Sequence, residues 1–123
     1  MEFFSTTTLS ASATDLLKRL IISELPRWCA SIASSHNETK SKGEIYCVWG
    51  PFQILREDLH YGVRFSLTDC PYALQWTVTT GHDPDPQHTY IHLTTNRKQH
   101  DPEFIDSIHQ FMADWKTGLE ARW

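Results

Sequence analysis

Histidine and aspartate side chains gather between residues 82 and 92, in the part of the chain best equipped for chemistry. The cluster consists of His82, Asp83, Asp85 and His88, with His92 four residues further on. Imidazole and carboxylate groups can together hold zinc or another divalent ion. However, the spacing matches no known ligand motif, and two interspersed prolines are typical of a rigid turn with solvated histidines. The sequence therefore predicts no metal and no other cofactor, with a metal site at His82, Asp83, Asp85 and His88 as the alternative.

Nucleophilic residues fall in no catalytic motif. The chain has no Gly-x-Ser-x-Gly segment, no glycine-rich phosphate loop and no dinucleotide-binding fingerprint. Cys47 lies in an apolar stretch, where a thiol is expected to be buried and unreactive, and Cys70 precedes a proline in a predicted turn. Glu57 and Asp58 stand beside Arg56 and are expected to be solvated charges rather than an acid–base pair. These observations favour a protein without catalytic residues.

Two segments of alternating polarity predict a second place where function can reside. Residues 73–80 and 89–95 each turn apolar side chains to one side and polar ones to the other, as half-buried strands do. Pairing the segments with their apolar sides together brings the polar side chains into one patch. This outer patch consists of Thr77, Thr79, Tyr90, His92 and Thr94, with Thr77 opposite His92 and Thr79 opposite Tyr90. Uncharged hydrogen-bonding groups around an aromatic ring are typical of a protein-binding or self-association surface, although threonine also favours ordinary solvated strands.

A third alternating segment precedes these two. Residues 61–67 place apolar or aromatic side chains at every odd position. Between 73–80 and 89–95 lie a glycine and two prolines, which indicate a turn rather than a continued strand. Keeping the apolar residues on one side sets the register of this hairpin, with Trp76 opposite Leu93.

An amphipathic helix is predicted at the C-terminal end. Asp101 is a favourable N-cap, and Pro102 fits the first helical position. Apolar side chains then recur at spacings of three and four residues: Ile105, Ile108, Met112, Trp115 and Leu119. Such a stripe is typical of a helix lying on a sheet. Gly118 is expected to weaken the last turn of this helix.

The first third of the chain predicts helix with irregular flanks. Residues 1–11 are expected to be a frayed lead-in. A capping box begins at Ser12 and a helical stripe follows, which Pro26 interrupts by removing a backbone donor. Either the helix kinks there and continues, or a second short helix begins with Pro26 in its first turn. Residues 34–43 are polar and are expected to form a loop.

Residues 44–59 permit two interpretations. They can form strand, broken or bulged near the middle, which the alternating apolar residues favour. A helix starting at Pro51 is the alternative, so 51–60 is open between strand and helix. With the strand interpretation the fold class is α+β: a two-layer sandwich with a four-stranded antiparallel meander sheet, an N-terminal helix kinked or broken by proline, and a C-terminal amphipathic helix. Residues 1–123 form one domain.

Composition narrows the classes of partner. The chain carries a net charge of −4, and phosphate binding needs clustered Lys and Arg, so nucleic acid is excluded as the main partner. No long apolar stretch or basic leader indicates a membrane span or a secretion signal. Three widely spaced cysteines do not form the pattern of a disulfide framework and favour a reducing compartment, the cytoplasm.

These features favour a non-catalytic interaction protein. It would be a small acidic cytoplasmic adaptor, chaperone or inhibitor of the immunity-protein kind, acting through the outer face of its sheet. Its partner would be another protein or a second copy of itself in a homodimer, without nucleic acid, membrane or cofactor. The alternative is a small ligand- or metal-binding enzyme that uses the histidine-rich loop 82–92.

Overall fold

The computed structural model describes residues 1–82, 86–96 and 101–123. Within these ranges the chain forms seven strands and four helices, one of them a 3-10 helix. The strands are β1 (Glu2–Thr6), β2 (Ile32–His36), β3 (Lys42–Cys47), β4 (Gly50–Leu59), β5 (Gly62–Leu67), β6 (Gln75–Thr80) and β7 (Thr89–Thr94). The helices are α1 (Ala13–Arg19), η1 (Ile22–Glu24), α2 (Leu25–Trp28) and α3 (Pro102–Arg122).

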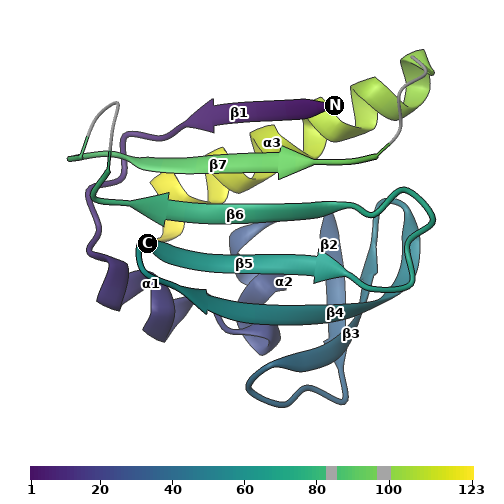
Figure 1. Ribbon diagram of the computed structural model, residues 1–123, viewed down its shortest axis with the longest axis horizontal. Helices are drawn as coiled ribbons and strands as arrows, with labels where there is room; N and C mark the ends of the chain where they lie inside the picture. The colour runs from purple at the N-terminus through teal and green to yellow at the C-terminus, as the bar shows by residue number, and fades with distance from the viewer. Residues whose placement is uncertain (83–85, 97–100) are drawn as a thin grey trace.

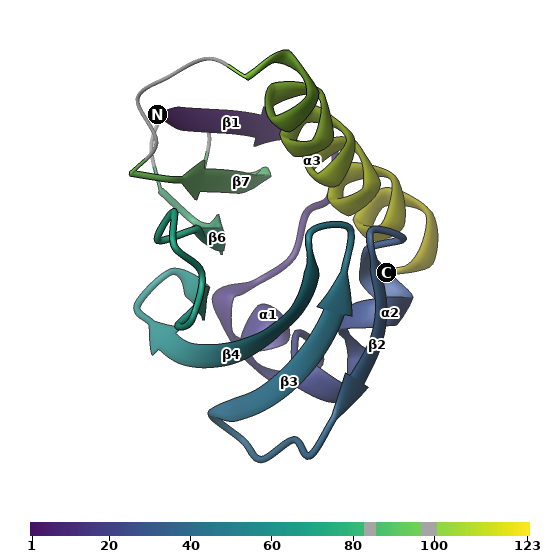
Figure 2. The same cartoon turned by 90° about the vertical axis from the view of Figure 1, so that its right-hand side faces the viewer.

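All seven strands belong to one antiparallel sheet with the order β1-β7-β6-β5-β4-β3-β2 (Figure 1). Strands β2 to β7 follow one another as a meander, and β1 pairs with β7 at the far edge. The sheet curls around the helices, and the long helix α3 runs past its inner side (Figure 2). The expected α+β class is confirmed, but the sheet has seven strands rather than four.

Two of the three extra strands, β1 and β2, lie at the edges of the sheet, where the sequence signal is weak. The third arises because residues 44–59, expected as one broken strand, form β3 and β4 on either side of a turn. Residues 1–11 were expected to fray, but residues 2–6 form β1 and pair with β7. Residues 34–43 were expected to be a loop, but they contribute to β2 and β3. An edge strand leaves one side unpaired and is short and polar, so its composition resembles that of a loop. Strand β2 is also irregular, because its register shifts between Ile32 and Ser34.

The inner strands follow the predicted pattern. Trp76 lies opposite Leu93 and Thr77 opposite His92, which confirms the expected hairpin register. For residues 51–60 the strand alternative is confirmed, since β4 extends from Gly50 to Leu59. Apolar side chains of the sheet then face those of α3, and both sets are buried in one core. The alternation of apolar and polar residues was therefore sufficient to predict the strands and the register at the centre of the sheet.

Capping residues and a proline set the starts of the helices. Ser12 and Asp15 form the predicted capping box of α1. Of the two alternatives at Pro26, the separate short helix is confirmed, because α2 begins at Leu25 with the proline in its first turn. Asp101 caps α3 as expected, with its side chain accepting from the backbone N–H of Glu103. Among the described residues, no helix has the length and apolar character needed to cross a membrane.

Gly118 has a packing role that the sequence did not predict. Helix α3 continues past it to Arg122. Gly118 is buried against α2, and a Cβ atom at this position would collide with the backbone carbonyl of Trp28. The missing side chain allows α2 and α3 to approach closely.

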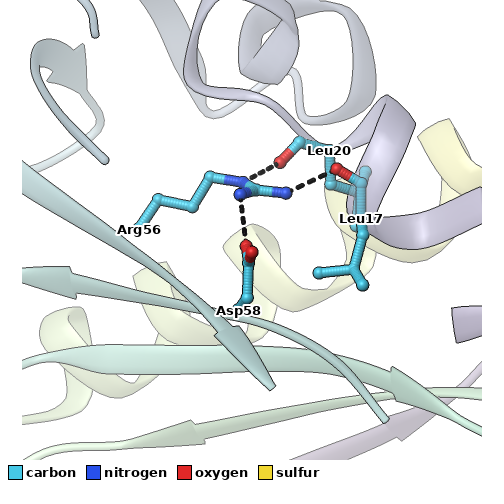
Figure 3. Close-up of polar contacts among 4 residues, drawn as sticks. All are labelled: Leu17, Leu20, Arg56 and Asp58. Carbon is cyan, nitrogen blue, oxygen red and sulfur yellow. Dashed lines mark hydrogen bonds and ion pairs between the residues drawn. The ribbon is translucent and has the colours of Figure 1, made fainter. Parts of the chain in front are cut away.

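Glu57 and Asp58 were expected to be solvated charges beside Arg56, and the Arg56 side chain itself lies buried in β4. Its Nε and Nη2 donate hydrogen bonds to the carbonyls of Leu20 and Leu17, at 2.8 and 2.6 Å (Figure 3). Its Nη1 lies 2.7 Å from Oδ1 of Asp58. Because carbonyls at a helix C-terminus lack partners within the helix, this guanidinium ties the end of α1 to the sheet.

Candidate functional site

An apolar pocket of about 290 Å³ opens beside the N-terminal end of α3. Its wall residues include Trp49, Phe52, Cys70, Tyr72, Leu74 and Phe104. They come from the β3–β4 turn, strand β4, the β5–β6 connection and the first turn of α3. None of these described wall residues carries a charge. A concave site lined by aromatic and aliphatic side chains is the usual form of a small-molecule site.

The aromatic wall on the helix side is fixed by hydrogen bonds. Nε1 of Trp49 donates to Oγ of Ser107 at 2.8 Å, and that hydroxyl donates to the carbonyl of Phe104 at 2.6 Å. The Trp49 ring also packs on Phe111, with ring centroids 4.9 Å apart. The indole is therefore held in place before any ligand arrives, which lowers the entropy cost of binding.

The opposite wall is held by the backbone of the β5–β6 connection. The carbonyl of Tyr72 accepts from Oγ1 of Thr95 and from the backbone N–H of Asn96, both at 2.8 Å. The Tyr72 ring packs on that of Phe104, with centroids 5.4 Å apart. The next residue, Ala73, has a φ of +47°, in the left-handed region that non-glycine residues rarely adopt. Strain of this kind is found preferentially at functional sites, because the surrounding structure must maintain it.

The three thiols differ in exposure. Cys70 is half-buried and lines the pocket, whereas Cys29 and Cys47 are buried, and none forms a disulfide. Burial raises the pKa of Cys47 and also that of Cys29 above the ordinary thiol value. Cys47 is thus a core residue, as its apolar surroundings in the sequence predicted.

A larger hollow of about 660 Å³ lies near the β3–β4 turn, with Ser31 and Asp114 among its walls. It is a shallow surface depression rather than an enclosed site. The Asp114 carboxylate already accepts hydrogen bonds from Oγ of Ser31 at 2.5 Å and from Nε2 of Gln110 at 2.8 Å. The smaller apolar pocket is more enclosed and is therefore the better candidate for a ligand-binding site.

The outer patch is assembled as the register predicted. Its five residues, Thr77, Thr79, Tyr90, His92 and Thr94, project from β6 and β7 on the side away from the core, and all are half-buried. The sequence interpretation missed one member, Phe4 of β1, because residues 1–11 were expected to fray. The Phe4 ring stacks on His92 with centroids 4.2 Å apart and remains 72% exposed.

Charged side chains border the outer patch, and the alternation of the strands did not predict them there. Nε2 of His92 lies 3.3 Å from Oε1 of Glu2, a close contact without the geometry of a hydrogen bond. On the other side, Arg64 lies opposite Thr77 and donates two hydrogen bonds to Glu57, at 3.1 and 3.0 Å. The surface therefore combines an exposed ring with a charged margin, as protein-binding surfaces often do.

The histidine-rich loop is described only in part. Nε2 of His82 lies 2.8 Å from Oγ1 of Thr79, within hydrogen-bond distance. The centroid of the His82 ring lies 5.5 Å from that of the Tyr90 ring. Asp83 and Asp85, two of the alternative metal ligands, lie outside the described residues. In the part of the chain that the structure describes, no three His, Cys, Asp or Glu side chains are grouped to hold a metal ion.

The pocket was missed at the sequence level because its walls come from four separate segments. Each wall residue taken alone is an ordinary apolar residue, and only the fold brings them together. The aromatic residues around Trp49 and Phe104 are far apart in the sequence, and their spacing follows no recognisable pattern. The proline and the cysteine of the β5–β6 connection indicated a turn, not a binding wall.

No family model and no curated protein matches this chain. Several solved structures share its fold. XoxI from Bacillus cereus is 15% identical, with a TM-score of 0.68 over 97% of this chain and 92% of that one. A START superfamily protein from Mycobacterium smegmatis is 12% identical, with a TM-score of 0.64 over 99% and 94% of the two chains. At such identities the likeness shows the fold alone: an α+β fold with a large antiparallel sheet and a C-terminal helix, similar to that of a START superfamily protein.

Proposed function

We propose that this protein binds a small apolar molecule in the pocket that Trp49, Phe104 and their apolar neighbours line. The observation that carries the proposal is a wall made of uncharged side chains, with the Trp49 indole fixed to α3 through Ser107. Such a pocket gains affinity by removing apolar surface from water, at about 25 cal/mol per Å².

We also propose that the protein resides in the cytoplasm. Its three free cysteines favour a reducing compartment.

The size of the pocket limits the size of the ligand. A dry apolar cavity of about 150 Å³ is large enough for benzene. A volume near 290 Å³ therefore suits a molecule of one or two fused rings. With about 0.5 kcal/mol per heavy atom, a ten-atom ligand such as naphthalene would bind with a Kd on the order of 0.1 mM.

The structural neighbours support this proposal only through the fold. A START superfamily protein has a similar arrangement of sheet and C-terminal helix. Fold alone does not assign a ligand, so the argument depends on the pocket of this chain. A binding role also agrees with the lack of a nucleophile–base pair among the described pocket walls.

Filling the pocket tests the proposal. Cys70→Phe would place a ring in the pocket, whereas Thr68→Phe places the same ring at an exposed site in the same connection. Naphthalene binding, measured by NMR titration of the ¹⁵N-labelled chain, should weaken about tenfold or more in Cys70→Phe and stay within about twofold in Thr68→Phe. Equal naphthalene affinity in the unmodified chain and in Cys70→Phe would contradict the proposal.

A second candidate function is protein interaction through the outer patch. The observation in its favour is the Phe4 ring, which is stacked on His92 yet mostly exposed. Aromatic anchors in an interface typically cost about 2 kcal/mol or more when truncated. The partner would be another protein or a second copy of this chain.

Removing the anchors tests this second role. Tyr90→Ala combined with His92→Ala should weaken association and leave the fold intact, because neither residue faces the core. Light scattering over a range of protein concentrations reports self-association, and pull-down from the native cell reports a foreign partner. An unchanged oligomeric state together with unchanged partners in the double variant would remove the patch from consideration.

A further inference from the structure

Two indole N–H groups in the core have no hydrogen-bond acceptor among the residues that the structure describes. Nε1 of Trp76 and Nε1 of Trp115 are both buried, and neither meets a partner among the described residues. The two side chains are 1% and 0% exposed, so bulk water does not reach them. Burying an unpaired donor costs free energy, and native proteins keep such groups rarely and for a reason.

Both donors belong to one aromatic cluster. The rings of Trp76 and Trp115 have centroids 6.4 Å apart, and each also packs on Phe65, at 5.4 and 6.2 Å. Trp76 meets Phe111 edge to face at 5.0 Å. Ring faces are at best weak acceptors, so these neighbours do not replace an oxygen atom.

This cluster reaches the apolar pocket through Phe111. The Phe111 ring packs on Trp49 at the pocket wall and on Trp76 in the cluster, with centroid distances of 4.9 and 5.0 Å. Leu74, another wall residue, is buried two positions before Trp76. Phe111 thus touches both the pocket wall and one of the two donor-bearing rings, and that ring packs in turn on Trp115.

We propose that the ligand is a neutral aromatic molecule bearing an oxygen acceptor, such as an aryl ketone, and that this oxygen accepts from Trp76 or Trp115. The inference rests on the proposed function of the pocket. The apolar ring would occupy the pocket lined by Trp49 and Phe104, and a shift of Phe111 would admit the oxygen. The acceptor is neutral because a carboxylate would lose its hydration among described walls and rings that offer no cation.

Three matched probes test the inference on the unmodified chain. They are 2-acetylnaphthalene, its hydrocarbon isostere 2-isopropenylnaphthalene, and the anion 2-naphthoate. The ketone should bind about tenfold more tightly than the isostere, a difference of about 1.4 kcal/mol, and the naphthoate should bind least. Because the probes change and the protein does not, no folding defect can affect the comparison.

The indole protons give a second, residue-specific readout. The five tryptophan N–H signals of the ¹⁵N-labelled chain can be assigned from single Trp→Phe variants. The ketone should shift the Trp76 or Trp115 signal downfield, whereas the isostere should disturb only the Trp49 signal at the pocket wall. A ketone that shifts neither core signal would overturn the inference.

The outcomes separate this inference from the proposed function. Equal binding of ketone and isostere, with both core signals unmoved, would leave the apolar pocket as a binding site and remove the role of the indoles. A long-lived water seen at these protons in the ketone complex would do the same. Absence of binding by all three probes would defeat the proposed function itself.

Discussion

Arg56 and Asp58 form an ion pair in which only one partner is buried. Their closest atoms are 2.7 Å apart, but the side chain of Arg56 is 3% exposed and that of Asp58 is 55% exposed. The carboxylate therefore remains well hydrated, and its attraction for the guanidinium is screened by water. The hydrogen bonds to the carbonyls of Leu17 and Leu20 are shielded from solvent, and we infer that they are the main contribution of Arg56 to stability (Figure 3).

This difference predicts unequal effects of removing the two charges. Arg56→Met leaves two helix-end carbonyls without donors and should cost about 3 kcal/mol of the free energy of unfolding. Asp58→Asn should cost less than about 1 kcal/mol, because the lost pair is half in water. Urea unfolding of both variants measures the difference. Similar losses in the two would mean that the ion pair, not the carbonyl contacts, dominates.

The contact between Gly118 and Trp28 predicts that an added methyl group destabilises the protein. Alanine is the better helix former by about 1 kcal/mol. In Gly118→Ala, however, the new Cβ would collide with the backbone of Trp28, which cannot move away as a side-chain tip could. We expect a net loss of about 2 kcal/mol.

A neighbouring exposed position of the same helix provides the control for Gly118. Thr117→Ala makes no such contact and should stabilise the chain by a few tenths of a kcal/mol, roughly 0.5 at most. Thermal unfolding of the two variants should therefore shift in opposite directions. A Gly118→Ala protein as stable as Thr117→Ala would show that α2 and α3 can separate at little cost.

The two sides of β6 predict a second contrast. Trp76 is 1% exposed in the core, whereas Thr77 lies half-buried on the outer patch. Trp76→Ala should cost about 3–5 kcal/mol through the cavity that it leaves. Thr77→Ala should cost well under about 1 kcal/mol. Comparable losses in chemical denaturation would contradict the strand phase.

The strand phase was predictable from sequence because its signal is local. Leu74, Trp76 and Val78 alternate with polar residues, and this alternation sets which side faces the core. The buried state of Arg56 was not predictable, because its partners belong to α1, more than thirty positions earlier. The edge strand β1 was missed for a related reason, since it pairs with β7, more than eighty positions later in the chain.

The candidate sites divide in the same way. The outer patch depends on one hairpin, so the sequence predicted five of its members and missed Phe4, which arrives from β1. The apolar pocket depends on four segments meeting at the end of α3. Its Trp49–Ser107 hydrogen bond spans 58 positions and has no counterpart in any local pattern.

The pair of Glu57 and Arg64 predicts a pH dependence on the outer face. Hydrogen bonds from Arg64 hold the pKa of the Glu57 carboxyl below its ordinary value. A carboxyl with a lowered folded-state pKa contributes stability above its unfolded pKa of about 4.3, and loses it as the pH falls through the folded value. The difference in stability between wild type and Glu57→Gln should therefore be constant above about pH 5 and shrink below about pH 4. A difference that instead grows in acid would refute this sign.

The thiols give a prediction that also reports on the pocket. Burial raises the pKa of Cys47 and that of Cys29, which disfavours their reactive thiolate forms in the folded chain. Cys70 is half-buried at the pocket wall and is the thiol within reach of a reagent. Iodoacetamide should therefore modify Cys70 first, and naphthalene in the pocket should slow that reaction.

The raised pKa values also fix how stability changes in alkali. A group with a raised folded-state pKa gives its full stabilisation below its unfolded pKa, about 8.5 for a thiol, and loses it as the pH rises further. Stability should thus fall above about pH 8.5, and the fall should be shallower in Cys29→Ala than in wild type. Mass spectrometry of the labelled sites and urea unfolding at pH 7 to 10 check both parts. Modification of Cys29 or Cys47 before Cys70 in the folded chain would show that the core opens faster than the pocket admits a small molecule.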